Sequence, residues 1–232
     1  METIILAAGK GERLGNLTKD TPKTLLEIEG SPIINFTIKV LSKSKNLDKI
    51  VINIQKDFKD VYVSKIDYDT KKINIVYNTD YNENILDALK NNVEKISGNA
   101  FLLLFGDSII DIDIDKLIDF YNMNEGKYSV LITSPKTYQA IGIEMKKNIA
   151  RSIFTKKVNS YDVCGAILNK NDINWNIKGD LLDLIYKDLA KRKKLKAYKF
   201  FGYYKNINIF KDVVDAENDL RDGKISFLST WT

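Results

Sequence analysis

The chain has 232 residues, a formal net charge of +5, no histidine and a single cysteine, Cys164. These counts exclude imidazole general bases, most zinc sites and an internal disulfide, and leave Lys, Arg, Asp, Glu, Asn, backbone amides or a hard cation such as Mg²⁺ to carry any chemistry. No apolar run reaches the roughly 18 residues of a membrane span and the N-terminus carries no secretion signal, so we expect a cytoplasmic protein.

Apolar runs of strand type alternate with amphipathic helical segments in the first half of the chain. This alternation predicts crossover connections and a mostly parallel sheet covered by helices on both faces. In chain order we expect a strand at 2–8, a helix at 32–44, a strand at 49–54, a helix at 57–65, a strand at 73–78, a helix at 85–96 and a strand at 100–105.

The pattern after residue 110 is less regular and richer in short strand-like runs. In chain order we expect a helix at 112–122, strands at 128–134, 140–145, 149–155 and 161–168, a helix at 180–192, a strand at 195–201 and a helix at 210–222. Linkers, repeats and low-complexity segments are absent from the sequence. The prediction is therefore one α/β domain, 1–232, whose mixed sheet carries a small β-rich insertion in its second half.

A glycine-rich turn, GKGERLG at 9–15, follows the first expected strand. Its third glycine comes one place too late for the dinucleotide pattern G-x-G-x-x-G, and Lys23 lacks the preceding glycines of a Walker A loop. What remains is Gly9 and Gly11, which allow close backbone approach, the forked donor Arg13, and Lys23 after the stiffening Pro22. This set predicts a site for phosphates at the carboxyl edge of the sheet.

Two further stretches place polar side chains at the same edge. Asp107 follows the buried strand 100–105 and Gly106, so its carboxylate is expected to emerge beside the glycine turn. The segment GYYKNINIFKDVVDAENDL at 202–220 brings Asn206 and Asn208 in front of the last expected helix. Carboxylate and amide oxygens of this kind suit Mg²⁺.

The stretch LAAGKGERLGNLTKDTPKTLLEIEGSPII closely resembles the signature of the sugar-phosphate nucleotidylyltransferases, LAAGxGxRL followed by PKxLLxI and PII. The match is dense over the first 34 residues, and weaker matches follow along nearly the whole chain. The resemblance implies a Rossmann-like α/β core. It also implies transfer of a nucleotide from a nucleoside triphosphate to a phosphate ester, with release of pyrophosphate.

The same resemblance assigns roles at the N-terminal site. Arg13 would neutralise the leaving pyrophosphate and Lys23 would lie by the reacting phosphates, so both are candidate catalytic residues. The candidate nucleotide-binding residues are Leu6, Ala7, Ala8, Gly9, Gly11, Asn78 and Asn84. Because a phosphate monoester is already largely dianionic at neutral pH, the reaction needs no general base and tolerates the lack of histidine.

The metal and acceptor sites depart from the family pattern. Asp107 matches the aspartate that binds Mg²⁺, whereas Asn206 replaces the second aspartate, with Asn208 as an alternative ligand; an asparagine brings no charge. In the family segment F-x-E-K-P, Lys156 replaces the glutamate. The resemblance implies four acceptor-binding residues, Gly142, Lys156, Lys157 and Gly165, with Lys156 suited either to an extra anionic group or to solvent.

Three functions follow. The first is formation of a nucleoside diphosphate sugar from a nucleoside triphosphate and a sugar 1-phosphate. The second is a CTP-dependent cytidylyltransferase acting on a polyol or choline phosphate, and the third is a non-catalytic regulatory subunit of the same fold. The expected partners are the triphosphate and a phosphorylated small molecule, without nucleic acid or membrane and without a C-terminal β-helix. A homodimer through the core is left open.

Overall fold

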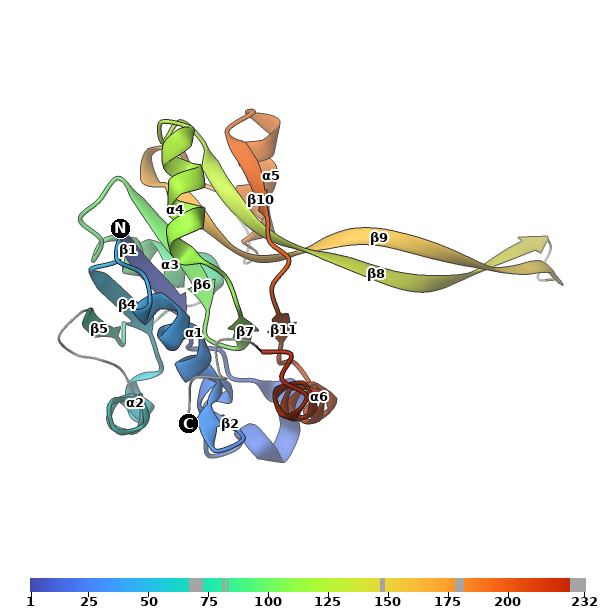
Figure 1. The fold of residues 1–232 in the computed structure, drawn as a ribbon, viewed down its shortest axis with the longest axis horizontal. Helices are drawn as coiled ribbons and strands as arrows, with labels where there is room; N and C mark the ends of the chain where they lie inside the picture. Colours follow the sequence, from blue (N-terminus) through green and yellow to red (C-terminus); the bar gives the residue numbers. More distant parts are fainter. Residues whose placement is uncertain (67–72, 81, 83, 147–148, 178–181, 226–232) are drawn as a thin grey trace.

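A seven-stranded mixed sheet, with strand order β10-β8-β9-β6-β1-β4-β5, runs through the protein (Figure 1). The computed structural model describes residues 1–66, 73–80, 82, 84–146, 149–177 and 182–225. The prediction of a mostly parallel, Rossmann-like α/β sheet flanked by helices is confirmed.

Four parallel strands end level with one another at one edge of the sheet. They are β1 (Glu2–Leu6), β4 (Lys49–Asn53), β5 (Asn74–Asn78) and β6 (Ala100–Phe105). In the register, Leu6 pairs with Asn53 on one side and Phe105 on the other, and Asn53 pairs with Asn78. The loops that leave these strands therefore gather at one edge, where open α/β sheets bind ligands.

The two faces of the sheet are buried under different helices. Ile5 of β1 packs in a core shared with α1 (Ile33–Ser42) and α4 (Ile114–Met123). Its neighbour Ile4 packs in a second core. That second core is shared with α3 (Ile85–Val93) and α5 (Asp183–Lys191). Since successive strand residues point to opposite faces, the continuous apolar run of β1 is explained by burial on both sides.

Short elements complete the N-terminal half. They are the 3₁₀ helices η1 (Glu12–Thr18), η2 (Lys23–Leu25) and η3 (Lys56–Phe58), the strands β2 (Glu27–Ile28) and β3 (Ser31–Pro32), and α2 (Lys59–Lys65). The expected elements of this half are confirmed to within a few residues at their ends.

The second half departs from the prediction of several short strands. The runs at 128–134 and 140–145 join into β8 (Ser129–Lys146), and those at 149–155 and 161–168 join into β9 (Ile149–Asn169). The ladder runs through Pro135 and the polar residues after it, with Pro135 opposite Tyr161. In a two-stranded ribbon each strand is an edge strand, where a missing N–H is tolerated.

The outer part of this hairpin leaves the body of the protein as a twisted ribbon (Figure 1). We call residues 135–146 and 149–161 the arm. Ile153 is 69% exposed and Phe154 is 50% exposed on it. The small β-rich insertion expected from the sequence is thus one long antiparallel hairpin, whose inner end belongs to the central sheet.

The C-terminal segment returns to the loop edge of the sheet. It follows η4 (Lys170–Asp172) and includes β10 (Leu195–Lys199), β11 (Tyr204–Asn206) and α6 (Phe210–Arg221). β11 pairs antiparallel with β7 (Ser108–Ile110), a pairing that the sequence did not reveal. Residues 180 and 181 of the expected helix at 180–192 lie outside the described residues. In the described part of the chain, helices are too short or too polar to cross a membrane.

Candidate active site

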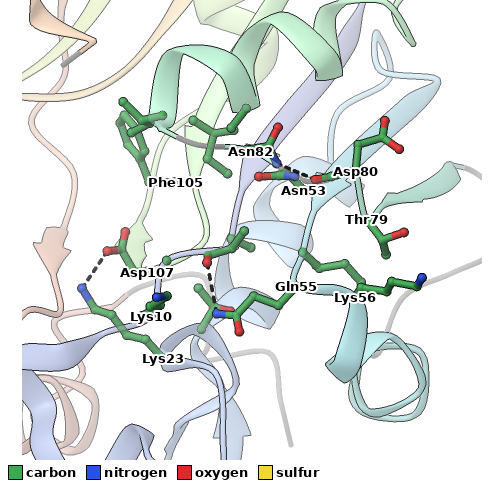
Figure 2. A pocket seen from close by; sticks show the side chains of 18 of the residues that line it. Lys10, Lys23, Asn53, Gln55, Lys56, Thr79, Asp80, Asn82, Phe105 and Asp107 are labelled. Atoms are coloured by element: carbon green, nitrogen blue, oxygen red, sulfur yellow. Dashed lines mark hydrogen bonds and ion pairs between the residues drawn. The ribbon is translucent and has the colours of Figure 1, made fainter. Parts of the chain in front are cut away.

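A cavity of about 650 Å³ opens at the carboxyl ends of the parallel strands (Figure 2). Its wall combines the loop after β1 with the ends of β4 and β6 and the start of α3. The lining residues are Leu6, Ala7, Ala8, Gly9, Lys10, Lys23, Thr24, Asn53, Ile54, Gln55, Lys56, Asp57, Thr79, Asp80, Asn82, Asn84, Ile85, Ala88, Phe105 and Asp107. A cavity of this size accommodates a nucleotide-sized ligand.

The backbone that leaves β1 is anchored on both sides. Ala7 N donates to Asn53 O at 2.9 Å, and Gly106 N donates to Leu6 O at 2.9 Å. Beneath it, the buried Tyr62 hydroxyl donates to Ala7 O at 3.1 Å and contacts the Thr24 hydroxyl at 2.6 Å. Burial raises the pKa of Tyr62 to about 12, so it remains a neutral donor. The loop is therefore held rigidly before any ligand arrives.

Gly9 and Gly11 serve different purposes in the turn. A Cβ on Gly9 would meet no described atom within 4 Å, so this glycine leaves the cavity side open to a ligand. Gly11 has φ +69°, and a Cβ there would lie 2.8 Å from Lys23 Cβ. It does not line the cavity. Its small size lets the stem of Lys23 pack directly under the loop.

Four polar side chains from distant segments, Arg13, Lys23, Asp107 and Asn208, form one hydrogen-bonded cluster, which we call the mouth of the cavity. Lys23 and Asp107 line the cavity, whereas Arg13 and Asn208 do not line it. Lys23, which is 6% exposed, donates from Nζ to Asp107 Oδ2 at 2.7 Å and to Asn208 Oδ1 at 3.2 Å. Arg13 Nη2 donates to the same Asn208 Oδ1 at 3.1 Å. Figure 2 shows the Lys23–Asp107 pair facing the cavity. Arg13, Lys23 and Asp107 together carry a formal charge of +1, which suits a polyanion.

The two candidate asparagines occupy different positions. Asn206 lies in β11 opposite Ser108, with an exposed side chain, and the next residue, Ile207, donates its N–H to Asp107 O at 3.0 Å. Asn208 turns its amide oxygen toward Lys23. The antiparallel β7–β11 ladder therefore brings the backbone at Asn206 close to Asp107, while Asn208 contacts the cations.

Two predicted nucleotide-binding residues have structural partners. Asn78 is 2% exposed and does not line the cavity. Its Nδ2 donates to Asn92 Oδ1 at 3.0 Å. Asn84 lines the cavity and caps α3, with its Oδ1 accepting from Leu86 N at 2.9 Å and Asp87 N at 3.0 Å. A ligand role for either residue stays a prediction. The cap that Asn84 provides explains why α3 begins at the cavity wall.

The cavity also contains residues that sequence reasoning missed. Gln55 follows β4 and donates from Nε2 to Ala8 O at 3.1 Å, which fixes the loop from the side of the neighbouring strand (Figure 2). Lys10, Lys56 and Asp80 also line the cavity. The signal for Gln55 was present, since β4 is next to β1 in the sheet and the residues just after both strands lie at the same edge.

The predicted acceptor-binding residues lie outside the cavity wall. Lys156 and Lys157 are exposed on the arm, and Gly142 pairs with Phe154 there. Gly165 lies in the central sheet, where a Cβ would stand 2.6 Å from Leu103 O, so its size permits close packing of β9 on β6. None of the four lines the cavity. Their acceptor role stays a prediction.

The donor set fits Mg²⁺ that is shared with a phosphate ligand. The described residues hold no group of three or more His, Cys, Asp or Glu that would enclose a metal alone. Mg²⁺ commonly binds through one or two carboxylates together with substrate phosphates. Asp107 supplies the carboxylate, and the amide oxygens of Asn206 and Asn208 are the neighbouring neutral donors.

A family model described as nucleotidyl transferase matches residues 2–143. The chain belongs to this family. The match covers β1, the loop with Arg13 and Lys23, and Asp107, which are the elements that meet at the cavity. The resemblance to sugar-phosphate nucleotidylyltransferases that the N-terminal motif suggested is thereby confirmed.

Individual relatives agree with the family. A bifunctional protein GlmU of Methanocaldococcus jannaschii is 26% identical over 241 residues, covering 96% of this chain and 55% of that protein. A probable glucose-1-phosphate cytidylyltransferase of Bacillus subtilis is 22% identical, covering 97% of this chain and 98% of that one. The crystal structure of HddC from Yersinia pseudotuberculosis complexed with GMP-PN shares the fold, with a TM-score of 0.67, 21% identity and coverage of 94% and 99%.

The chain spans about half the length of some curated relatives that it matches, 55% and 54% for two archaeal GlmU proteins. Family membership rests on the matched model.

Proposed function

We propose that the protein transfers a nucleoside monophosphate from a nucleoside triphosphate to a sugar 1-phosphate and releases pyrophosphate. The observation that carries this proposal is the meeting of Arg13, Lys23 and Asp107 at the mouth of the 650 Å³ cavity. Two cations and a carboxylate beside an anchored glycine loop match a reaction in which one polyanion attacks another and expels a third.

The residues act by positioning and by neutralising charge. The loop 6–9 offers its backbone to the nucleotide, with Gly9 giving open access. Lys23 faces the reacting phosphates from the buried side, and Arg13 faces the leaving pyrophosphate. The phosphate monoester of the acceptor attacks the α-phosphorus directly, since it is already largely dianionic at neutral pH. No proton has to be removed by the protein.

Asp107 would hold Mg²⁺ together with the phosphates, with Asn206 as the adjacent neutral ligand. When bound, the ion would neutralise charge on the triphosphate. Lys23 Nζ lies 2.7 Å from Asp107 Oδ2, so the ammonium balances the charge of this partly buried carboxylate.

The cationic run at 191–194 gives little support to a nucleic-acid partner. It lies at the C-terminal end of α5 and does not line the cavity. Two of its four cations have acidic partners: Arg192 Nε donates to Asp188 Oδ2 at 2.9 Å, and Lys194 Nζ lies 3.5 Å from Asp172 Oδ1. Cations paired within their own surface are less available for a phosphate backbone. A cytoplasmic location and a homodimer remain predictions.

The decisive test is pyrophosphate release with Mg²⁺ across the four ribonucleoside triphosphates and dTTP. Each triphosphate is paired with hexose, heptose, inositol and choline phosphates. Release with a sugar 1-phosphate and one triphosphate is the expected result and would name both substrates. Triphosphate binding without release for any pair would instead favour the non-catalytic subunit.

One observation favours CTP, ATP or GTP over UTP and dTTP as the triphosphates to test first. Gln55 donates from Nε2 to Ala8 O, and its Oε1 has no hydrogen-bond partner among the described residues. An amide oxygen in the cavity wall accepts from an exocyclic amino group, which cytosine, adenine and guanine carry and uracil and thymine lack. CTP is among these triphosphates, so the CTP-dependent enzyme acting on a polyol or choline phosphate is retained as the second candidate.

A further inference from the structure

One oxygen atom is shared by both cations of the site. Asn208 Oδ1 accepts from Arg13 Nη2 at 3.1 Å and from Lys23 Nζ at 3.2 Å. These two donors come from the N-terminal loop, 195 and 185 residues away in the sequence. Among the described residues, Asn208 is the side chain that accepts a hydrogen bond from the Arg13 guanidinium.

Asn208 is itself held firmly at the start of α6. Its N–H donates to Asp212 Oδ2 at 2.7 Å, and Ile209 N donates to the same oxygen at 2.9 Å. Asp212 N in turn donates to Ile209 O at 2.9 Å. This reciprocal bonding at a helix N-terminus fixes the backbone of Asn208, so its side chain offers the cations a defined acceptor.

The neutrality of Asn208 matters for a polyanion site. An amide oxygen orders Arg13 and Lys23 without cancelling their charge, and the formal sum with Asp107 stays at +1. A carboxylate at the same position would pair with both cations and lower the sum to zero. The ion pairs would then have to be broken before phosphates could bind.

We propose that Asn208 is a positioning residue, which holds Arg13 and Lys23 ready for the phosphates and is not a metal ligand. This inference rests on the proposed function. Where a neutral ligand completes the metal site beside Asp107, it would be Asn206.

The substitution Asn208→Asp decides between the two roles because they predict opposite signs. If Asn208 positions cations, the added carboxylate should weaken binding of tripolyphosphate in EDTA by about ten-fold or more. It should also raise KM for the triphosphate. If Asn208 binds Mg²⁺, the carboxylate should instead increase activity at limiting Mg²⁺. Binding as tight as wild type in EDTA, or higher activity at limiting Mg²⁺, would overturn the proposal.

Asn208→Ala and Asn208→Ser separate positioning from a merely structural role. The alanine variant should lower kcat by about ten-fold or more, because two donors lose their common acceptor. Serine should restore part of the loss, since it is also an acceptor. The midpoint of thermal unfolding should change little in both. No recovery with serine, together with a lowered unfolding midpoint, would contradict the positioning role.

Two control variants complete the test. Asn122→Asp makes the same chemical change on the exposed surface of α4 and should leave tripolyphosphate binding unchanged. Asn206→Asp should increase activity at limiting Mg²⁺, without the weaker tripolyphosphate binding expected for Asn208→Asp. Equal behaviour of the two aspartate variants would overturn the distinction between these positions.

The same measurements distinguish this inference from the proposed reaction. Tripolyphosphate binding that responds to the Asn208 variants, without pyrophosphate release for any substrate pair, would remove the reaction and keep the positioning role. Failure of the wild-type protein to bind tripolyphosphate would remove the positioning role itself, because the cations would then not be presented to phosphates.

Discussion

The mouth of the cavity and the arm are built on opposite principles. At the mouth, Lys23 is 6% exposed and contacts Asp107 and Asn208, which come from two other segments. On the arm, the two strands pair with each other beyond the edge of the central sheet, and Ile153 is 69% exposed. Side chains at the mouth are fixed by topology, because several strand ends must meet there, whereas those on the arm follow a single local pairing.

This contrast explains why residues at the mouth are easier to place from the sequence than residues on the arm. A motif residue at the end of a parallel strand lies at a known edge of the sheet. A motif residue on a ribbon can face either side, and its position in the sequence does not say what it contacts. The following variants test whether function is confined to the mouth, beginning with the largest expected effect.

Lys23→Ala should lower turnover by about 10²–10³-fold, since it removes a preorganised cation from the reacting phosphates. Lys59→Ala, which removes an exposed lysine of α2, is the matched control and should retain turnover. Steady-state pyrophosphate release measures both. Near-normal turnover in Lys23→Ala would remove the catalytic assignment and with it the claim that the mouth is the centre of function.

Asp107→Asn should raise the Mg²⁺ concentration needed for half-maximal activity by about ten-fold or more, because the carboxylate at the site is lost. Tripolyphosphate binding in EDTA should not weaken, since Lys23 loses an anionic partner and the local formal charge rises from +1 to +2. A Mg²⁺ titration and calorimetry give the two readouts. An unchanged titration would put the metal elsewhere.

Gly11→Ala should lower the free energy of unfolding by about 1–3 kcal/mol. The added Cβ would lie 2.8 Å from Lys23 Cβ, on a backbone with φ +69°. Gly30→Ala is a matched control, because φ is +77° there and a Cβ would meet no described atom within 4 Å. Denaturant unfolding compares them. Equal losses would mean that backbone strain alone explains the effect, without crowding of Lys23.

The double variant Lys156→Ala and Lys157→Ala should leave triphosphate affinity and thermal stability unchanged, since both side chains are exposed on the arm outside the cavity. Any effect should be confined to KM for the acceptor. A weakened triphosphate affinity would contradict the separation of mouth and arm.

The smallest effect concerns the attachment of α6. Burial raises the pKa of Asp219, but hydrogen bonds from Lys205, Lys224 and Tyr203 outweigh it and hold that pKa at about 2. The resulting stabilisation is present above the ordinary aspartate value of 3.8 and is lost as pH falls toward about 2. Urea unfolding should therefore show wild type more stable than Asp219→Asn at pH 7, with the gap shrinking below pH 4.

Much of the fold could be predicted because its signals are local. Apolar runs and helical periodicity located β1, β4, β5 and β6, and the strand alternation implied their parallel order. The arm could not be predicted as a unit. Pro135 interrupts the strand pattern, and only the pairing with Tyr161 shows that the strand continues through it.

The sequence predicted which residues meet at the mouth better than it predicted their contacts, and their roles stay predictions. Arg13, Lys23 and Asp107 stand in recognisable motifs, whereas the contacts of Asn208 with Arg13 and Lys23 join distant segments in a way that no local pattern encodes. Gln55 was missed for a similar reason, because its importance comes from the neighbouring position of β4 and β1 in the sheet.

The meeting of Arg13 with Asn208 has a consequence for the nascent chain. At about 5–20 residues per second, the 195 residues between them take about 10–40 s to synthesise. During that interval Arg13 leaves the ribosome without its acceptor Asn208, and Lys23 emerges well before Asp107. A partly synthesised chain therefore lacks the complete mouth of the cavity, which can assemble only when the segment with Asn208 and α6 docks.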